Sequence, residues 1–210
     1  MNIYLFKHAD PVIFKRLLEE AVIGIRQGSI EWQGSVNPEK NSNFEYPGWV
    51  CSNHHVTSLL IDTNCFDVIS SLAESLSSPL ISVRFQEKSF WETSLYVGKE
   101  TKISFSTSPT HWGEAEAKKY FCDPAVLAEI WGVPVEKFDR YLVDWGLSEI
   151  WIEDLKMMSP TFVKRGEKAY PSDTYKYGDL YQGLDFMGAL GASLPSDGGQ
   201  FKVYLPPIRR

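Results

Sequence analysis

The residues of this sequence best suited to bind a metal ion lie near position 50. Cys51, His54 and His55 form a Cys-x2-His-His cluster, and zinc accepts thiolate and imidazole ligands. A structural zinc site needs four ligands, so another would have to come from Asp62, Cys65 or His111. Adjacent histidines in a strand point to opposite faces and rarely bind one ion. We interpret the cluster as a polar junction between a loop and a strand, and the sequence predicts no metal site.

A cysteine nucleophile is the second chemistry that the residues allow. Cys65 could act with His55 and Asp62, because it starts an expected helix whose dipole can lower the pKa of a thiol. Cys65 also falls on the apolar stripe of that helix, together with Ile69 and Leu72. That position favours a buried, unreactive thiol.

Two pairs of carboxylates could carry out acid–base work: Glu114 with Glu116, and Glu153 with Asp154. Their spacing is equally typical of a solvated helix face. The chain contains neither G-x-G-x-x-G nor G-x-x-x-x-G-K-[ST], the common nucleotide-binding motifs. The sequence therefore predicts no catalytic residue and no cofactor and favours a protein that is not an enzyme. A hydrolase or transferase with an unrecognised site stays open.

A tyrosine-rich segment between positions 170 and 181 has the composition of a recognition surface. Tyrosine offers a rigid contact area with a hydrogen-bonding tip, and aspartates stand among the rings. The candidate binding residues are Tyr170, Asp173, Tyr175, Tyr177, Asp179 and Tyr181. An acidic, aromatic surface would suit a basic partner protein. The alternative is that these tyrosines cover the sheet and fill the edge of the core.

Residues 127–142 read LAEIWGVPVEKFDRYL. With Ala128, Gly132, Val133 and Phe138 at matching positions, the segment resembles a helix-turn-helix of the bacterial repressor type. The resemblance implies a DNA-binding regulator that uses residues 124–145. The five acidic and two basic residues between positions 123 and 144 would oppose an approach to phosphates. A packed corner of two helices joined by a glycine turn is the alternative that we favour.

Several elements must position these residues. Alternation of apolar and polar residues predicts strands over 81–86, 91–97 and 101–105, with Gly98 and Lys99 as the turn of an antiparallel meander. Shorter apolar runs predict strands at 3–6, 30–33, 56–62 and 201–205. Residues 37–47 are polar and rich in turn formers, and we expect a loop there.

Helices are expected where apolar residues recur every three or four positions. Asp10-Pro11 and Asp123-Pro124 each combine a capping residue with a proline at the first helical position. Further helices are predicted over 64–76, over 135–145 and within 184–190. Strands precede helices with little strict alternation, so we predict an α+β fold in which an antiparallel sheet packs against helices and the C-terminal half is helical.

Bulk composition is that of an ordinary folded domain, with 43% hydrophobic and 23% charged residues in 210. We expect one compact domain over 1–210, with a possible division into a sheet lobe, 1–108, and a helical and loop lobe, 109–210. A net charge of -6 argues against nucleic acid and anionic membranes as partners. Three widely spaced cysteines, with no signal peptide or long apolar run, predict a cytoplasmic protein. We predict a protein–protein interaction module, such as an acidic antidote or adaptor for a basic partner.

Overall fold

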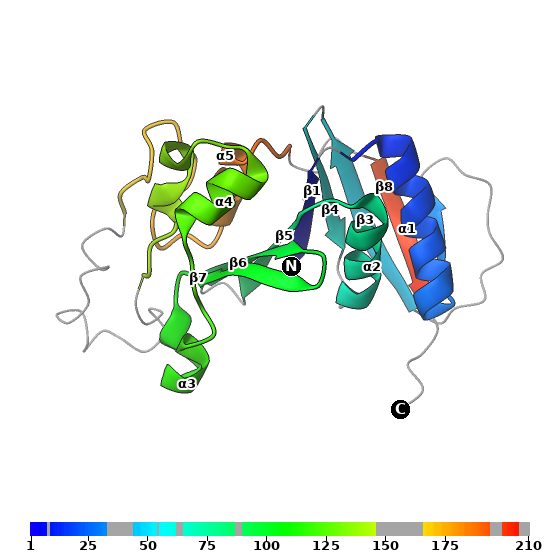
Figure 1. Cartoon of the computed structure of the whole chain (residues 1–210), viewed down its shortest axis with the longest axis horizontal. Coiled ribbons are helices and arrows are strands. Elements are labelled where there is room, and N and C mark those ends of the chain that lie inside the picture. Colours follow the sequence, from blue (N-terminus) through cyan, green and yellow to red (C-terminus); the bar gives the residue numbers. More distant parts are fainter. Residues whose placement is uncertain are drawn as a thin grey trace. The chain divides into compact units, whose positions relative to one another are not determined.

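The computed structural model describes residues 1–7, 9–32, 44–53, 55–61, 65–86, 90–145, 166–193 and 199–205. The chain forms two compact units (Figure 1). Unit 1 contains residues 1–80, 97–99 and 192–210, and unit 2 contains residues 81–96 and 100–191. The units differ from the lobes 1–108 and 109–210 because the C-terminal segment returns to the first sheet.

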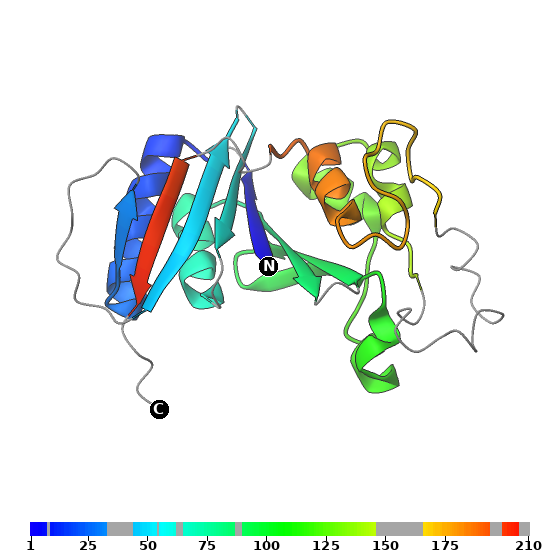
Figure 2. The same cartoon turned by 180° about the vertical axis from the view of Figure 1, so that it is seen from behind.

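Unit 1 is built on five antiparallel strands in the order β2-β8-β3-β4-β1. The strands are β1 (Asn2–Lys7), β2 (Ser29–Trp32), β3 (Phe44–Ser52), β4 (Val56–Ile61) and β8 (Gly199–Leu205). Figure 2 shows β8 between β2 and β3. The predicted strands of this unit are therefore confirmed, and their register brings the two ends of the sequence into one sheet.

The expected loop over 37–47 is wrong for its last four residues, which belong to β3; residues 37–43 lie outside the described residues. Proline normally disfavours a central strand because it has no N–H to donate. The described pairing with β4 runs from Gly48, opposite Ile61, to Ser52, and Pro47 pairs with Lys202 of β8. Among the described residues, β8 alone pairs with β3 at Pro47, and a proline is tolerated where a strand has a neighbour on one side.

Two helices cover one face of this sheet, α1 (Pro11–Arg26) and α2 (Phe66–Leu76) (Figures 1 and 2). As predicted, Asp10 caps α1 by accepting hydrogen bonds from the backbone N–H groups of residues 12 and 13. The helix ends at Arg26, and its C-cap residue, Gln27, has a left-handed φ of 52°. Phe14 packs edge-on against Phe6 of β1, with ring centroids 5.0 Å apart.

Unit 2 begins with the predicted meander, β5 (Leu80–Gln86), β6 (Phe90–Val97) and β7 (Glu100–Ser106), in that spatial order. Gly98 takes a φ of 57° in the turn between β6 and β7, which confirms the glycine-first turn. Alternate residues of each strand are buried, among them Ile81, Val83, Leu95 and Ile103. The opposite face carries the polar residues of the alternation.

The rest of unit 2 is only partly helical. It contains α3 (Glu114–Ala117), α4 (Pro124–Trp131) and α5 (Gln182–Ala189), with 3₁₀ helices at Pro109–Trp112, Val135–Lys137 and Asp139–Tyr141. The Asp123 cap of α4 and the helix within 184–190 are confirmed. None of the helices in the described parts of the chain has the length and apolarity needed to cross a lipid bilayer.

The predicted helix over 135–145 is wrong, because the described residues form two short 3₁₀ helices there. Phe138 separates them with a φ of -138°, outside the helical region. The apolar stripe is nevertheless buried at Phe138, Tyr141 and Trp145. The periodicity therefore identified core residues correctly, whereas the backbone between them bends to bring the side chains of 139–141 against a neighbouring loop.

Helix α5 packs closely against the meander at Gly183, so a larger side chain at this position should destabilise the protein. A Cβ atom at this position would lie 2.9 Å from Cε1 of Phe85 and 3.3 Å from Cδ2 of Trp91. Because overpacking a buried site typically costs about 1–3 kcal/mol, Gly183→Ala is expected to lower the free energy of unfolding by that amount. Chemical denaturation followed by tryptophan fluorescence measures it.

Gly188→Ala in the same helix is the matched control, since a Cβ there would meet nothing within 4 Å. The control is expected to be neutral or to stabilise the protein by up to about 1 kcal/mol, because alanine is the better helix former. Equal effects of the two substitutions would contradict the packing of α5 on Phe85 and Trp91.

Candidate functional site

The tyrosine-rich segment forms a closed loop in unit 2. The N–H of Gly166 donates to the carbonyl of Tyr177 at 3.1 Å, and the N–H of Tyr177 donates to the carbonyl of Glu167 at 2.8 Å. The ends of this stretch therefore meet, as they do in compact Ω-loops, which are frequently functional. Gly166 has a φ of 86°, a value that few other residues adopt at low cost.

A buried carboxylate organises the interior of this loop. Asp173 is 6% exposed and accepts hydrogen bonds from the hydroxyl of Tyr141 at 2.5 Å and from the backbone N–H of Tyr170 at 2.9 Å. Burial, together with the bond to Asp173, raises the pKa of Tyr141 well above its usual value. A buried carboxylate requires such partners because water no longer solvates it.

The 3₁₀ helix Asp139–Tyr141 supplies most of the loop's anchors. Asp139 accepts a hydrogen bond from the hydroxyl of Tyr170 at 2.8 Å, and the carbonyl of Arg140 accepts one from the hydroxyl of Tyr177 at 2.6 Å. The guanidinium of Arg140 lies 5.2 Å from the centroid of the Tyr170 ring. Burial and the bond to Asp139 raise the pKa of Tyr170 to about 12.

A hollow of about 620 Å³ opens beside the end of this loop. Its lining residues are Gly166, Lys176, Tyr177, Gly178, Asp179, Leu180 and Tyr181. Tyr181 is 47% exposed, and its ring lies 5.8 Å from that of Tyr175 and 6.4 Å from that of Phe85. Asp179 accepts the N–H of Tyr181 at 2.9 Å through one carboxylate oxygen. An exposed ring and a carboxylate thus stand together at the mouth of the hollow.

The six candidate binding residues divide into two groups. Asp173 and Tyr177 are buried, and with Tyr170 they hold the loop against Asp139–Tyr141. Asp179 and Tyr181 are exposed, and Tyr175 pairs with the Tyr181 ring. Structural packing therefore explains the first group, whereas a binding role for the second stays a prediction. Sequence reasoning missed the anchoring role of Arg140, because no sequence pattern links residue 140 to a loop thirty positions further on.

Where the structure describes them, the candidate metal ligands are not gathered into such a site. Among the described residues, no three His, Cys, Asp or Glu side chains lie close enough to hold a metal ion; His54 and Asp62 are outside them. Cys65 is 2% exposed, and burial raises the pKa of its thiol to about 12. The predicted burial of Cys65 is therefore confirmed.

The described pair of candidate acid–base carboxylates, Glu114 and Glu116, lies in the short helix α3. Glu116 binds the ammonium of Lys119 at 2.6 Å on the surface of α3, while Glu153 and Asp154 lie outside the described residues. His111 packs its ring 4.6 Å from the ring of Phe90. These contacts are typical of surface ion pairs and core edges.

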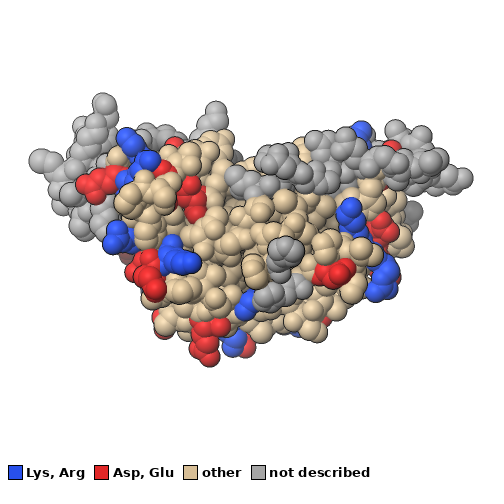
Figure 3. All heavy atoms as spheres, turned by 90° about the horizontal axis from the view of Figure 1, so that it is seen from above, with Lys and Arg blue, Asp and Glu red and all other residues tan. Residues whose placement is uncertain are grey.

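The segment that resembles a helix-turn-helix keeps its first helix and its glycine turn. Gly132 ends α4 with a φ of 77°, but two short 3₁₀ helices replace the α-helix that would enter a DNA groove. Figure 3 shows Lys and Arg interspersed with Asp and Glu on one face of the molecule, rather than gathered into a basic patch among its described residues.

Comparison with known proteins gives no relative: no protein-family model, no curated protein and no solved structure matches the chain.

Removal of a single hydroxyl tests the buried network. Tyr141→Phe leaves Oδ1 of Asp173 without its partner, and hydrogen bonds to buried carboxylates contribute about 1.5–3 kcal/mol. We expect the free energy of unfolding to fall by that amount. Tyr175→Phe is the control, expected to change stability by less than about 0.5 kcal/mol. Equal losses of unfolding free energy in the two variants, measured by urea denaturation, would show that the hydrogen bond from Tyr141 to Asp173 does not stabilise the fold.

Alkaline pH provides a second test of the same hydroxyls. The pKa values of Tyr141, Tyr170 and Tyr177 are raised in the folded protein, whereas unfolded tyrosines have a pKa of about 10. The unfolded chain therefore loses these protons first, so the stability they contribute is complete below about pH 10 and is lost as the pH rises further.

Tyrosinate absorbance and circular dichroism, recorded together, measure this effect. We expect some tyrosines to ionise near their usual pKa while the fold persists, and the rest to ionise only as the fold is lost. Ionisation of all 10 tyrosines in one step, with the fold intact, would contradict the network.

Proposed function

We propose that this protein is a non-enzymatic protein–protein interaction module, located in the cytoplasm, that docks or neutralises a basic partner through Tyr181 and Asp179. The observation that carries the proposal is the hollow of about 620 Å³ in which the exposed Tyr181 ring and the Asp179 carboxylate stand together. A lysine or arginine side chain of the partner would lie against the ring and reach the carboxylate.

Preorganisation supports this role for Tyr181. Its ring is fixed by neighbouring rings of Tyr175 and Phe85, and its backbone N–H is held by Asp179. A side chain that is ordered before binding loses less conformational entropy when the partner arrives. Tyrosine is also among the residues that most often dominate the binding energy of protein interfaces.

The charge of the surrounding surface favours a basic partner. Between positions 166 and 185, the charged residues that are not buried are three acids, Glu167, Asp179 and Asp185, and two bases, Lys168 and Lys176. The whole chain carries a net charge of -6. Complementary charge accelerates encounter with a positive protein and weakens as salt screens it.

Affinity capture from the native lysate, with quantitative mass spectrometry, tests the proposal. Wild type is expected to retain a basic protein that both Tyr181→Ala and Asp179→Lys fail to retain. Truncating an interface anchor typically costs about 2 kcal/mol or more, so we expect at least a roughly 30-fold loss of affinity in a titration with the purified partner. The affinity should also fall as the salt concentration rises.

Phe121→Ala is the matched control, because Phe121 is a comparably exposed aromatic residue, at 50%, outside the hollow. It is expected to retain the same protein as wild type. The proposal fails if all four proteins retain the same set, or if the captured partner is acidic.

A further inference from the structure

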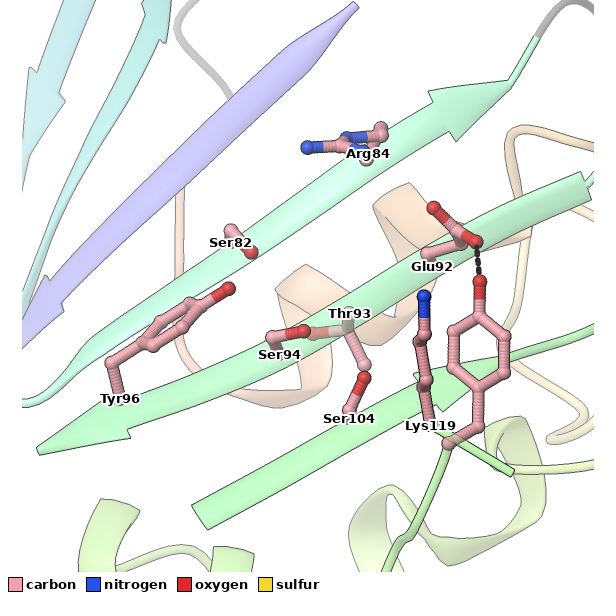
Figure 4. A pocket seen from close by; sticks show the side chains of 9 residues that line it. Ser82, Arg84, Glu92, Thr93, Ser94, Tyr96, Ser104 and Lys119 are labelled. Atoms are coloured by element: carbon pink, nitrogen blue, oxygen red, sulfur yellow. Dashed lines mark hydrogen bonds between the residues drawn. The ribbon is translucent and has the colours of Figure 1, made fainter. Parts of the chain in front are cut away.

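A second hollow, of about 200 Å³, lies on the polar face of the meander. Its lining comes from the three strands and from the turn after α3: Ser82, Arg84, Glu92, Thr93, Ser94, Tyr96, Ser104, Lys119 and Tyr120. Figure 4 shows serine hydroxyls on all three strands, with Arg84 above them. No candidate binding residue of the tyrosine-rich segment contributes to it, so it is a separate site of unit 2.

Glu92 supplies the negative charge of this hollow, and two hydrogen bonds hold its carboxylate in place. Oε1 of Glu92 accepts a hydrogen bond from the hydroxyl of Tyr120, and Oε2 accepts one from Nε2 of Gln86 at 3.0 Å. The backbone of Phe121 pairs with that of Ser104 through bonds of 2.6 and 2.9 Å. This pairing fixes Tyr120 at the edge of β7, and burial with the bond to Glu92 raises its pKa well above the usual value.

Arg84 supplies the positive side of the hollow. Arg84 is exposed, and no described residue forms a hydrogen bond or ion pair with its guanidinium. Lys119, the other cation of the lining, binds both carboxylate oxygens of Glu116 at 2.6 Å. The arginine fork matches a planar carboxylate with two parallel hydrogen bonds. Arg84 is therefore the group of this hollow best placed to bind an anionic ligand.

We propose that this hollow binds a small hydroxy acid, a ligand with one carboxylate and several hydroxyl groups. The carboxylate pairs with Arg84, and the hydroxyl groups exchange hydrogen bonds with Ser82, Ser94 and Ser104. A hydroxyl at the far end donates to Glu92, whose oxygens retain accepting capacity.

The charge arrangement selects this class over other anions. A phosphate dianion would bring two negative charges close to Glu92, and like charges in a partly buried site repel strongly. A simple aliphatic acid would pair with Arg84 but would form no hydrogen bond with the serine hydroxyls and would not use the remaining accepting capacity of Glu92. The volume of about 200 Å³ limits the ligand to about the size of a single sugar acid.

A ¹H–¹⁵N NMR titration with D-glucuronate tests the proposal, with D-glucose and acetate as probes that each lack one half of the recognition chemistry. We expect glucuronate to give saturable shifts at residues 82, 84, 94 and 104, with a dissociation constant in the millimolar range or below. Glucose lacks the carboxylate that pairs with Arg84, and acetate lacks the hydroxyl that donates to Glu92. Because hydrogen bonds to charged groups are stronger than those between neutral groups, each probe should bind at least about 10-fold more weakly than glucuronate.

Arg84→Gln is expected to reduce glucuronate binding to the level of glucose. Lys102→Gln is the matched control. Lys102 lies in β7 on the same polar face of the meander, pairs with Glu100 at 2.7 Å and does not line the hollow. It should leave binding unchanged. No saturable shift with glucuronate, equal affinity for glucose, or equal losses from the two substitutions would each overturn the proposal.

Discussion

A carboxylate removed from water must find hydrogen-bond donors inside the protein, and Asp173 finds them in Tyr141 and in the backbone of Tyr170. The bond from Tyr141 joins the loop 166–181 to the 3₁₀ helix Asp139–Tyr141, and the bond from Tyr170 closes a turn within the loop. Tyr170, Tyr177 and Arg140 add further bonds between the same two segments. The position of the exposed Tyr181 ring depends on this loop being ordered, and so the proposed partner surface depends on Asp173.

The same interactions explain why the helical stripe at 135–145 does not form an α-helix. Its apolar residues are buried as the periodicity predicts. Between them, Asp139, Arg140 and Tyr141 all contact the loop, and a regular α-helix would spread three consecutive side chains around its circumference. The bent 3₁₀ backbone therefore lacks the regular hydrogen bonds of an α-helix, and the side chains of 139–141 form hydrogen bonds to the loop instead.

Local signals predicted most of the elements but little of their assembly. The α+β class, the meander, the Asp10 and Asp123 caps and the short C-terminal helix follow from alternation, periodicity and capping chemistry. The pairing of β8 between β2 and β3 involves segments far apart in sequence, and no local pattern specifies it. The loop expected over 37–47 was wrong at 44–47 for the same reason, because the pairing of these residues with β8 joins segments that are far apart in the sequence.

The candidate sites show the same division. Composition predicted a recognition surface among the tyrosines, but it did not distinguish the tyrosines that hold the loop from those that face solvent. Arg84 and Glu92 belong to an alternation that predicted only a polar face. Their relation to Tyr120 depends on the pairing of Phe121 with Ser104, which follows a turn and a short helix. A site built from several strands can be predicted only if the pairing register of those strands is known. That register is set by the folded sheet and is not encoded in any local pattern.

Amide hydrogen exchange within the loop tests the central claim that Asp173 holds an ordered surface. The N–H groups of Gly166, Asp173 and Tyr177 donate to backbone carbonyls, so they should exchange much more slowly than in an unstructured peptide, with protection approaching that of α5. In Asp173→Asn their protection should fall while that of α1 and α2 is retained. Exchange at the unstructured rate in the wild-type protein would contradict the account.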